Sequence, residues 1–212
     1  MTEMTLPAPG LAGAGPAGRA RGARLIRWGA RAAVAAPVLA AFSIAAGVPI
    51  FAAELPDVAG SARWVLVTAS ALALLLLLGA GLLAIHLTQE HRLGRLGHVS
   101  AVVALAGTVL AAGGAWDSVF TVPYLAEVAP DVLERPTSGP LLAGYVGSYL
   151  VLVIGWAAYA VATLRARVLP RGPATALLAG AVLAILPAPT SLRLLVLSLG
   201  LALLARAVLR AR

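Results

Sequence analysis

The sequence predicts an all-α protein, a polytopic bundle of six transmembrane helices with both termini in the cytoplasm. Of the 212 residues, 61% are hydrophobic and only 11% are charged, which is too little polar surface to cover a water-soluble domain. Apolar runs of about 20 residues follow one another along the chain, and this is the length that a helix needs to cross roughly 30 Å of hydrocarbon. Arginine gathers beside alternate ends of these runs.

Residues 1–32 are predicted to form a disordered, basic cytoplasmic tail, because a Pro/Gly/Ala-rich start that cannot bury apolar surface is followed by five arginines. A single transmembrane domain is expected over residues 33–212. Its predicted spans lie near 33–53, 64–86, 99–119, 141–164, 172–188 and 191–208. The last two flank LPAPTS, so they are either two spans joined by a very tight turn or one helix interrupted inside the membrane.

An outer loop with a short amphipathic helix is expected over residues 121–140. Leu125, Val128 and Val132 recur at helical spacing, while Glu127 and Asp131 lie on the opposite side. Pro130 can split this helix into two turns. The pattern indicates a helix on the membrane surface, serving either as a cap over the bundle or as a lid over a pocket.

The distribution of arginine predicts the orientation. Thirteen of the sixteen basic residues, all of them arginine, lie in the tail, in two alternate loops and at the C-terminal end. Short loops rich in positive charge stay in the cytoplasm, so the expected location is the cell membrane, with several passes and both ends inside. The formal charge of +8 is therefore a topology signal, and no nucleic-acid partner is expected because aromatic residues do not alternate with the arginines.

Asp117 is the leading candidate for a ligand-binding residue. It lies eighteen residues into the third predicted span, about 27 Å from its inner end, which places it at the outer rim and not at the bilayer centre. Trp116 beside it suits the aromatic belt at that level. Arg193 and Arg63, each near the outer start of a span, are its expected partners, and these four residues make up the predicted site.

Other residues carry weaker signals. His86 and His98 are placed to face each other across a hairpin and are the candidates for a metal or haem, although no metal site and no cofactor are predicted. Tyr145, Tyr149, Trp156 and Tyr159 fall along one stripe, which indicates a packing or interface seam. Small residues at helical spacing, Gly107 with Ala111 and Gly144 with Ser148, predict close helix contact.

The chain lacks the features of known catalytic classes. Without cysteine it has no disulfides, thiolate nucleophiles or cysteine metal sites. The motifs of serine hydrolases, zinc proteases and phosphate-binding loops are absent. No acid lies in the middle of a predicted span, where proton relays and cation transporters need one. An enzyme is therefore not predicted.

Residues 155–187, GWAAYAVATLRARVLPRGPATALLAGAVLAILP, form a helix ending in Ala-x-Leu-Arg-Ala, then x-Leu-Pro-Arg, then another apolar helix. This segment resembles one found in uncharacterised six-span integral membrane proteins of high-GC bacteria. The resemblance implies a six-helix membrane fold and carries no reaction, ligand or functional residue.

Three functions remain open at this stage. The first is a membrane protein that binds or moves a small lipophilic or lipid-like ligand at an outer site around Asp117. The second is a structural or regulatory partner of another membrane protein. The third is a redox protein that holds haem or a metal at His86 and His98. All three take the lipid bilayer as surroundings.

Overall fold

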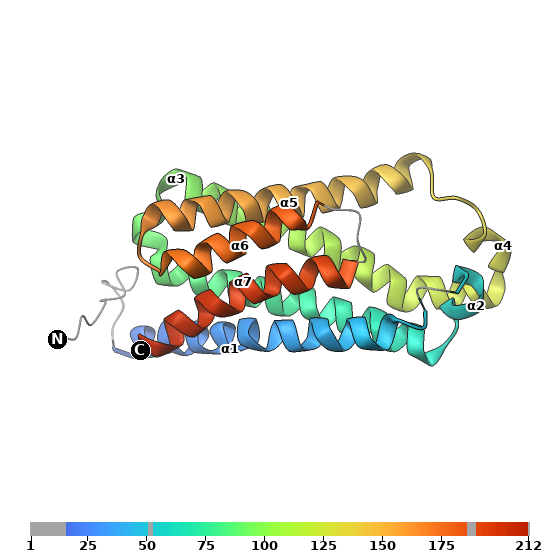
Figure 1. The fold of residues 1–212 in the computed structure, drawn as a ribbon, viewed down its shortest axis with the longest axis horizontal. Coiled ribbons are helices and arrows are strands. Elements are labelled where there is room, and N and C mark those ends of the chain that lie inside the picture. The colour runs from blue at the N-terminus through green and yellow to red at the C-terminus, as the bar shows by residue number, and fades with distance from the viewer. Residues whose placement is uncertain (1–15, 51–52, 186–189, 212) are drawn as a thin grey trace.

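The computed structural model describes residues 16–50, 53–185 and 190–211, and within these ranges the chain is helical without any strand, which confirms the all-α class. The helices are α1 (Pro16–Gly47), α2 (Leu55–Ala59), α3 (Ala62–Val128), α4 (Pro130–Leu133), α5 (Gly139–Ala166), α6 (Arg171–Leu183) and α7 (Thr190–Arg210). Figure 1 shows the long helices running side by side in an elongated bundle.

Four helices of the described chain are long and apolar enough to cross a membrane, and not the predicted six. Two predicted spans, 64–86 and 99–119, belong to the single 67-residue helix α3. A third, 172–188, corresponds to α6, whose 13 residues reach only about 20 Å; its residues 186–188 lie outside the described ranges. The spans 64–86 and 99–119 nevertheless lie in separate helical parts of α3, because the backbone between them is not helical at Gly94.

Gly94 divides α3 into two arms, residues 62–93 (the first arm) and 95–128 (the second arm). Its φ of 62° and ψ of −170° are open to glycine but strained for other residues. The arms run antiparallel, because Trp64 near the start of one donates its indole N–H to the Ser118 carbonyl near the end of the other, at 2.8 Å. The two predicted spans therefore form a hairpin, as their arginine-bearing connection suggested.

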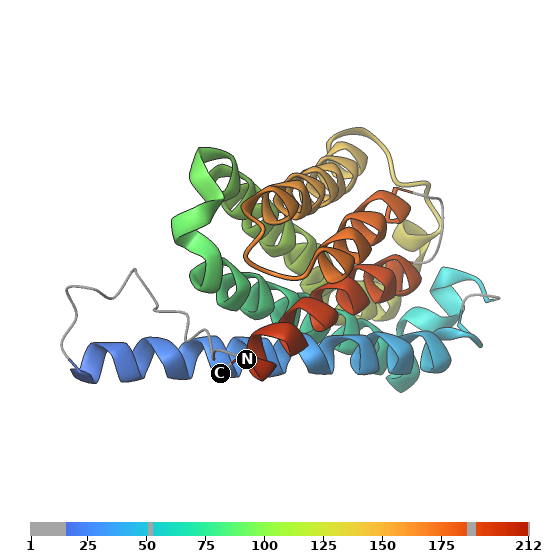
Figure 2. The same cartoon turned by 60° about the vertical axis from the view of Figure 1, so that its left-hand side comes forward.

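The segments pack in a ring. The first arm contacts α1, the second arm contacts α5, α5 contacts α6, α6 contacts α7, and α7 closes onto α1 (Figure 2). Helices α6 and α7 are antiparallel neighbours, since Gly180 lies against Leu197 and Gly200 against Leu177. Residues 171–183 and 190–210 thus form two helices that fold back on each other, and of the two only α7 is long enough to cross a membrane. The start of α1 and the end of α7 lie at the same end of the bundle (Figure 1).

The predicted disordered tail is wrong over residues 16–32, which form the first half of α1; residues 1–15 lie outside the described ranges. Alanine and arginine are strong helix formers. More importantly, Ile26 and Ala30 on this stretch are only 3% and 0% exposed. Burial against neighbouring helices stabilises the segment, and composition alone does not reveal that contact.

The outer loop also differs from its prediction. No separate helix covers 121–140, because α3 continues through Pro123 to Val128 and only the single turn α4 follows. Pro130 occupies the first position of α4, where a missing N–H costs nothing. The expected break at this proline is therefore present, while the surface helix is mostly the end of the second arm.

Glycines set the closest approach between α3 and α5. A Cβ added at Gly107 would lie 2.3 Å from the backbone of Leu152, and one at Gly155 would lie 2.4 Å from the backbone N of Ala104. Backbone atoms cannot move aside as a flexible side chain can. By contrast, Gly144 has open space around it, so of the two predicted small-residue contacts only the one at Gly107 brings helices together.

We expect Gly155→Ala to lower the free energy of unfolding by about 1–3 kcal/mol, because the new methyl group overpacks the contact between α3 and α5. Gly147, in the same helix, has nothing within 4 Å, so Gly147→Ala should instead raise stability by about 0.5–1 kcal/mol through helix propensity. Denaturant unfolding of the detergent-purified protein measures both. Equal responses at the two positions would contradict the packing described above.

Candidate functional site

A cavity of about 460 Å³ lies in the half of the bundle away from the start of α1. It is bordered by α2, by both arms of α3, by α5 and by the beginning of α7. Most of its lining is apolar, with a few hydroxyl groups and one indole. The lining residues include Ile50, Leu55, Val58, Trp64, Val67, Thr68, Ala71, Leu75, Leu110, Ala111, Gly114, Ala115, Ser118, Tyr145, Ser148, Tyr149, Leu152 and Leu194.

The short α6–α7 hairpin accounts for the position of the cavity. Among the described side chains, none of α6 and only Leu194 of α7 contribute to its lining. The end of α6 lies against the middle of α5, where the Tyr149 hydroxyl donates a 2.7 Å hydrogen bond to the Ala184 carbonyl. The cavity adjoins this contact, since Tyr149 is one of its lining residues together with others from α5, both arms of α3 and α2.

Two tyrosines one turn apart on α5 form a polar edge of the cavity. The Tyr145 hydroxyl donates a 2.7 Å hydrogen bond to Oδ2 of Asp117. The guanidinium of Arg193 lies 4.3 Å from the centroid of the Tyr149 ring, which is a cation–π contact. Asp117 and Arg193, which the sequence predicts as partners, thus each contact a tyrosine of α5. Asp117 is hydrogen-bonded to Tyr145, and Arg193 makes a cation–π contact with Tyr149, one turn further along the helix.

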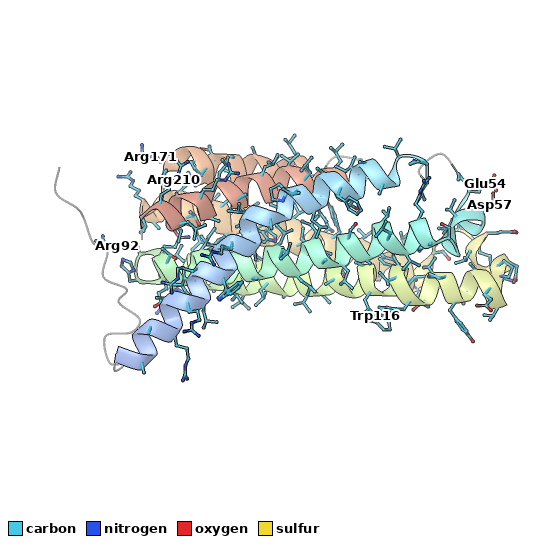
Figure 3. The ribbon with its side chains drawn as sticks, turned by 90° about the horizontal axis from the view of Figure 1, so that it is seen from below. Glu54, Asp57, Arg92, Trp116, Arg171 and Arg210 are labelled. Atoms are coloured by element: carbon cyan, nitrogen blue, oxygen red, sulfur yellow. The ribbon has the colours of Figure 1, made fainter. Side chains whose placement is uncertain are left out.

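None of the four predicted site residues lines the cavity itself. Asp117 and Arg193 contact its lining through Tyr145 and Tyr149, whereas Trp116 and Arg63 make no such interaction among the described residues. Trp116 is 54% exposed and stacks on Phe120, with ring centroids 5.2 Å apart; Figure 3 shows it on the outer side of the bundle. Arg63 is exposed at the start of α3. Trp116 therefore fits the expected aromatic belt better than a ligand contact.

The sequence analysis missed several lining residues. Trp64 carries a signal, because an indole at the start of an apolar span marks a polar boundary. Thr68 and Ser118 carry none, since isolated hydroxyls are common in transmembrane helices. The predicted aromatic stripe divides in two, as Tyr145 and Tyr149 line the cavity while Trp156 and Tyr159 are fully buried as a packing seam.

A second polar cluster lies near the Gly94 bend. The side-chain amide of Gln89, which is fully buried, donates to the Tyr159 hydroxyl at 3.2 Å and to Oγ1 of Thr163 at 2.9 Å. These hydrogen bonds connect the first arm of α3 to α5. Because the surroundings are apolar, an unpaired amide here would be costly, so this cluster fixes the relative height of the two helices.

His86 and His98 face each other across the hairpin, as predicted, with ring centroids 5.1 Å apart and planes at 89°. Rings in edge-to-face contact leave no room for a porphyrin between them. The described residues contain no group of three histidine, cysteine, aspartate or glutamate side chains that could hold a metal. The geometry gives the haem and metal hypothesis no support, and it accounts for the pair as a packing contact.

Comparison of the chain with protein-family models, with curated proteins and with solved structures finds no match. The resemblance of residues 155–187 to six-span membrane proteins therefore stays a prediction. The fold and the cavity define a class of protein that is broader than the six-span family of that prediction. Over the residues that the structure describes, the chain is helical, has four helices long and apolar enough to cross a membrane, and holds an apolar cavity with a tyrosine-lined edge.

A double-mutant cycle tests the buried amide. Gln89→Leu and Thr163→Val should each lower the free energy of unfolding by about 1–3 kcal/mol, because each leaves a buried polar partner without its hydrogen bond. The double variant should lose less than the two losses added together, with a coupling of about 0.5–1.5 kcal/mol. Strictly additive losses in denaturant unfolding would show that the hydrogen bond contributes nothing to stability.

Proposed function

We propose that this chain is a multi-pass protein of the cell membrane that binds a small lipophilic or lipid-like ligand in the cavity between α3 and α5. The observation that carries the proposal is the cavity itself. Its volume of about 460 Å³ lies within the roughly 300–1,000 Å³ of small-molecule sites. Its lining is mostly apolar, with polar groups confined to a few positions, as in sites that bury an apolar ligand and orient it by one end.

The hydroxyl groups of the cavity favour a ligand that donates hydrogen bonds. Those of Thr68, Ser118, Ser148 and Tyr149 each donate to a backbone carbonyl, and that of Tyr145 donates to Asp117. Their protons are therefore used within the protein, while lone pairs on the hydroxyl oxygens remain. An apolar molecule ending in an alcohol or an amine matches this arrangement.

The charges support both termini on the cytoplasmic side. Arg92, Arg171 and Arg210 lie at the end of the bundle where α7 ends, whereas Glu54 and Asp57 lie at the opposite end (Figure 3). We propose that each arm of α3 crosses the bilayer once and that α6 and α7 enter and leave from the arginine-rich side. This gives six embedded segments, and the termini share a side whatever depth the tip of that hairpin reaches. The cavity then opens within the outer half of the membrane.

The cavity is tested by filling it. Ala71→Phe places a benzyl group among the lining residues, so we expect native mass spectrometry of the gently solubilised protein to show several-fold less retained lipophilic molecule than for the unaltered chain. Ala106→Phe is the matched control, because Ala106 is exposed on the second arm of α3. A retained molecule whose amount is the same in both variants, or the absence of any in the unaltered protein, would refute ligand binding in this cavity.

The orientation is tested with single cysteines, which the cysteine-free chain permits without background labelling. In intact cells, a membrane-impermeant maleimide should label Glu134→Cys, between α4 and α5, and should leave Arg210→Cys unlabelled until the membrane is opened. The reverse pattern would place the arginine-rich end outside. Labelling of both positions in intact cells would mean that the two ends of the bundle are not on opposite sides of the membrane.

A further inference from the structure

A second hollow, shallow and open, lies at the arginine-rich end of the bundle and has no part in the proposed ligand site. Its volume is about 580 Å³, and four of the residues that line it are arginines: Arg92, Arg165, Arg167 and Arg171. All four side chains are exposed. Among the described residues no carboxylate lines the hollow, so no described residue of its wall neutralises these charges.

The convergence of these arginines is a property of the tertiary structure. Arg92 lies beside the Gly94 bend of α3, whereas the other three lie around the turn between α5 and α6, more than seventy residues later in the chain. Retention of loops in the cytoplasm requires positive charge in each loop and does not require the loops to share one hollow. Like charges repel one another, so gathering them in one place is unfavourable unless an anion occupies the space between them.

The backbone conformation of Arg167 also supports an anion at this hollow. Arg167 ends α5 with a φ of 54°, and it is the one residue other than glycine with a positive φ among those described. Helices commonly end in this left-handed conformation with glycine, because a Cβ is disfavoured there. An arginine at such a position indicates a requirement for its side chain, since glycine would satisfy the backbone better.

Helix α6 adds to the positive potential. It begins at Arg171, has no acidic residue in its first turn and has no side chain capping its N-terminus. The first N–H groups of a helix lack partners within the helix and carry partial positive charge, which favours an anion nearby. The hollow thus combines four guanidinium groups with the uncapped N-terminus of a 13-residue helix.

We propose that this hollow binds a phosphate-bearing anion. Guanidinium groups hold phosphate through paired hydrogen bonds and keep their charge at any physiological pH. Two sources offer this chemistry at the end of a membrane bundle, the phosphate of an anionic lipid headgroup and a soluble phosphorylated molecule. Both would contact the same arginines, and the experiment separates them.

The full-length protein in non-ionic detergent is titrated in two ways at fixed ionic strength. One titration adds dioleoylphosphatidylglycerol to the micelles, with dioleoylphosphatidylcholine as the uncharged comparison. The other adds inorganic pyrophosphate to lipid-free micelles. Native mass spectrometry counts the bound molecules, and the melting temperature reports stabilisation. Dependence on phosphatidylglycerol identifies the headgroup as the occupant, and dependence on pyrophosphate identifies a soluble phosphate.

The decisive variant is the pair Arg165→Gln and Arg167→Gly, because glycine keeps the left-handed backbone at position 167 and the fold is retained. At roughly five-fold per arginine, this pair should weaken binding on the order of 20-fold. The control pair is Arg24→Gln and Arg27→Gln on α1, which removes the same charge from exposed positions and should leave affinity unchanged. Equal loss in both pairs, or no binding of either probe to the unaltered protein, would overturn the proposal.

Discussion

Close contact between helix backbones at glycine is the constraint on which this bundle depends. In a bilayer the lipid tails are as apolar as leucine, so helices gain little by burying apolar side chains against each other, and dense packing has to supply the attraction. Glycine permits that density because it has no side chain to keep two backbones apart. The glycines at these contacts are Gly29, Gly81, Gly107, Gly155, Gly180 and Gly200. They determine which helices are neighbours and at what height each pair meets.

The lengths of the helices then determine where the bundle is hollow. The two arms of α3 and α5 are long, whereas α6 has only 13 residues. Just after the end of α6, the Tyr149 hydroxyl donates a hydrogen bond to the Ala184 carbonyl, and Tyr149 also lines the cavity between α5 and the arms of α3. At the other end, the bend at Gly94 and the left-handed turn at Arg167 bring the polar connections together. Both hollows therefore follow from where helices stop, not from any special motif within them.

The two ends of the bundle have different chemical character, and a mostly apolar core lies between them. One end holds the cavity, the Asp117–Tyr145 hydrogen bond and the acidic residues Glu54 and Asp57, while the other holds the arginine hollow (Figure 3). Between them, buried polar side chains form hydrogen bonds with one another, such as Gln89 with Tyr159 and Trp156 with Thr108. The two proposed sites, one for an apolar ligand and one for an anion, share no lining residue among those described.

The sequence by itself determined the helical class, the apolar segments, the gathering of arginine at one end and the opposition of His86 and His98, because hydropathy, charge and helix length are local properties. The predicted position of Asp117 at the outer rim stays a prediction, and the helix that carries it continues to Val128, beyond the predicted end of the span at 119. Only the tertiary structure decided that the two arms of α3 join directly at Gly94, that residues 16–32 are helical, and that Tyr145 and Tyr149 hold Asp117 and Arg193 beside a cavity. Those features depend on which helix surfaces pack against each other. The packing is determined by close backbone contacts at glycines and by the lengths of the helices, and the sequence of a single segment does not reveal either.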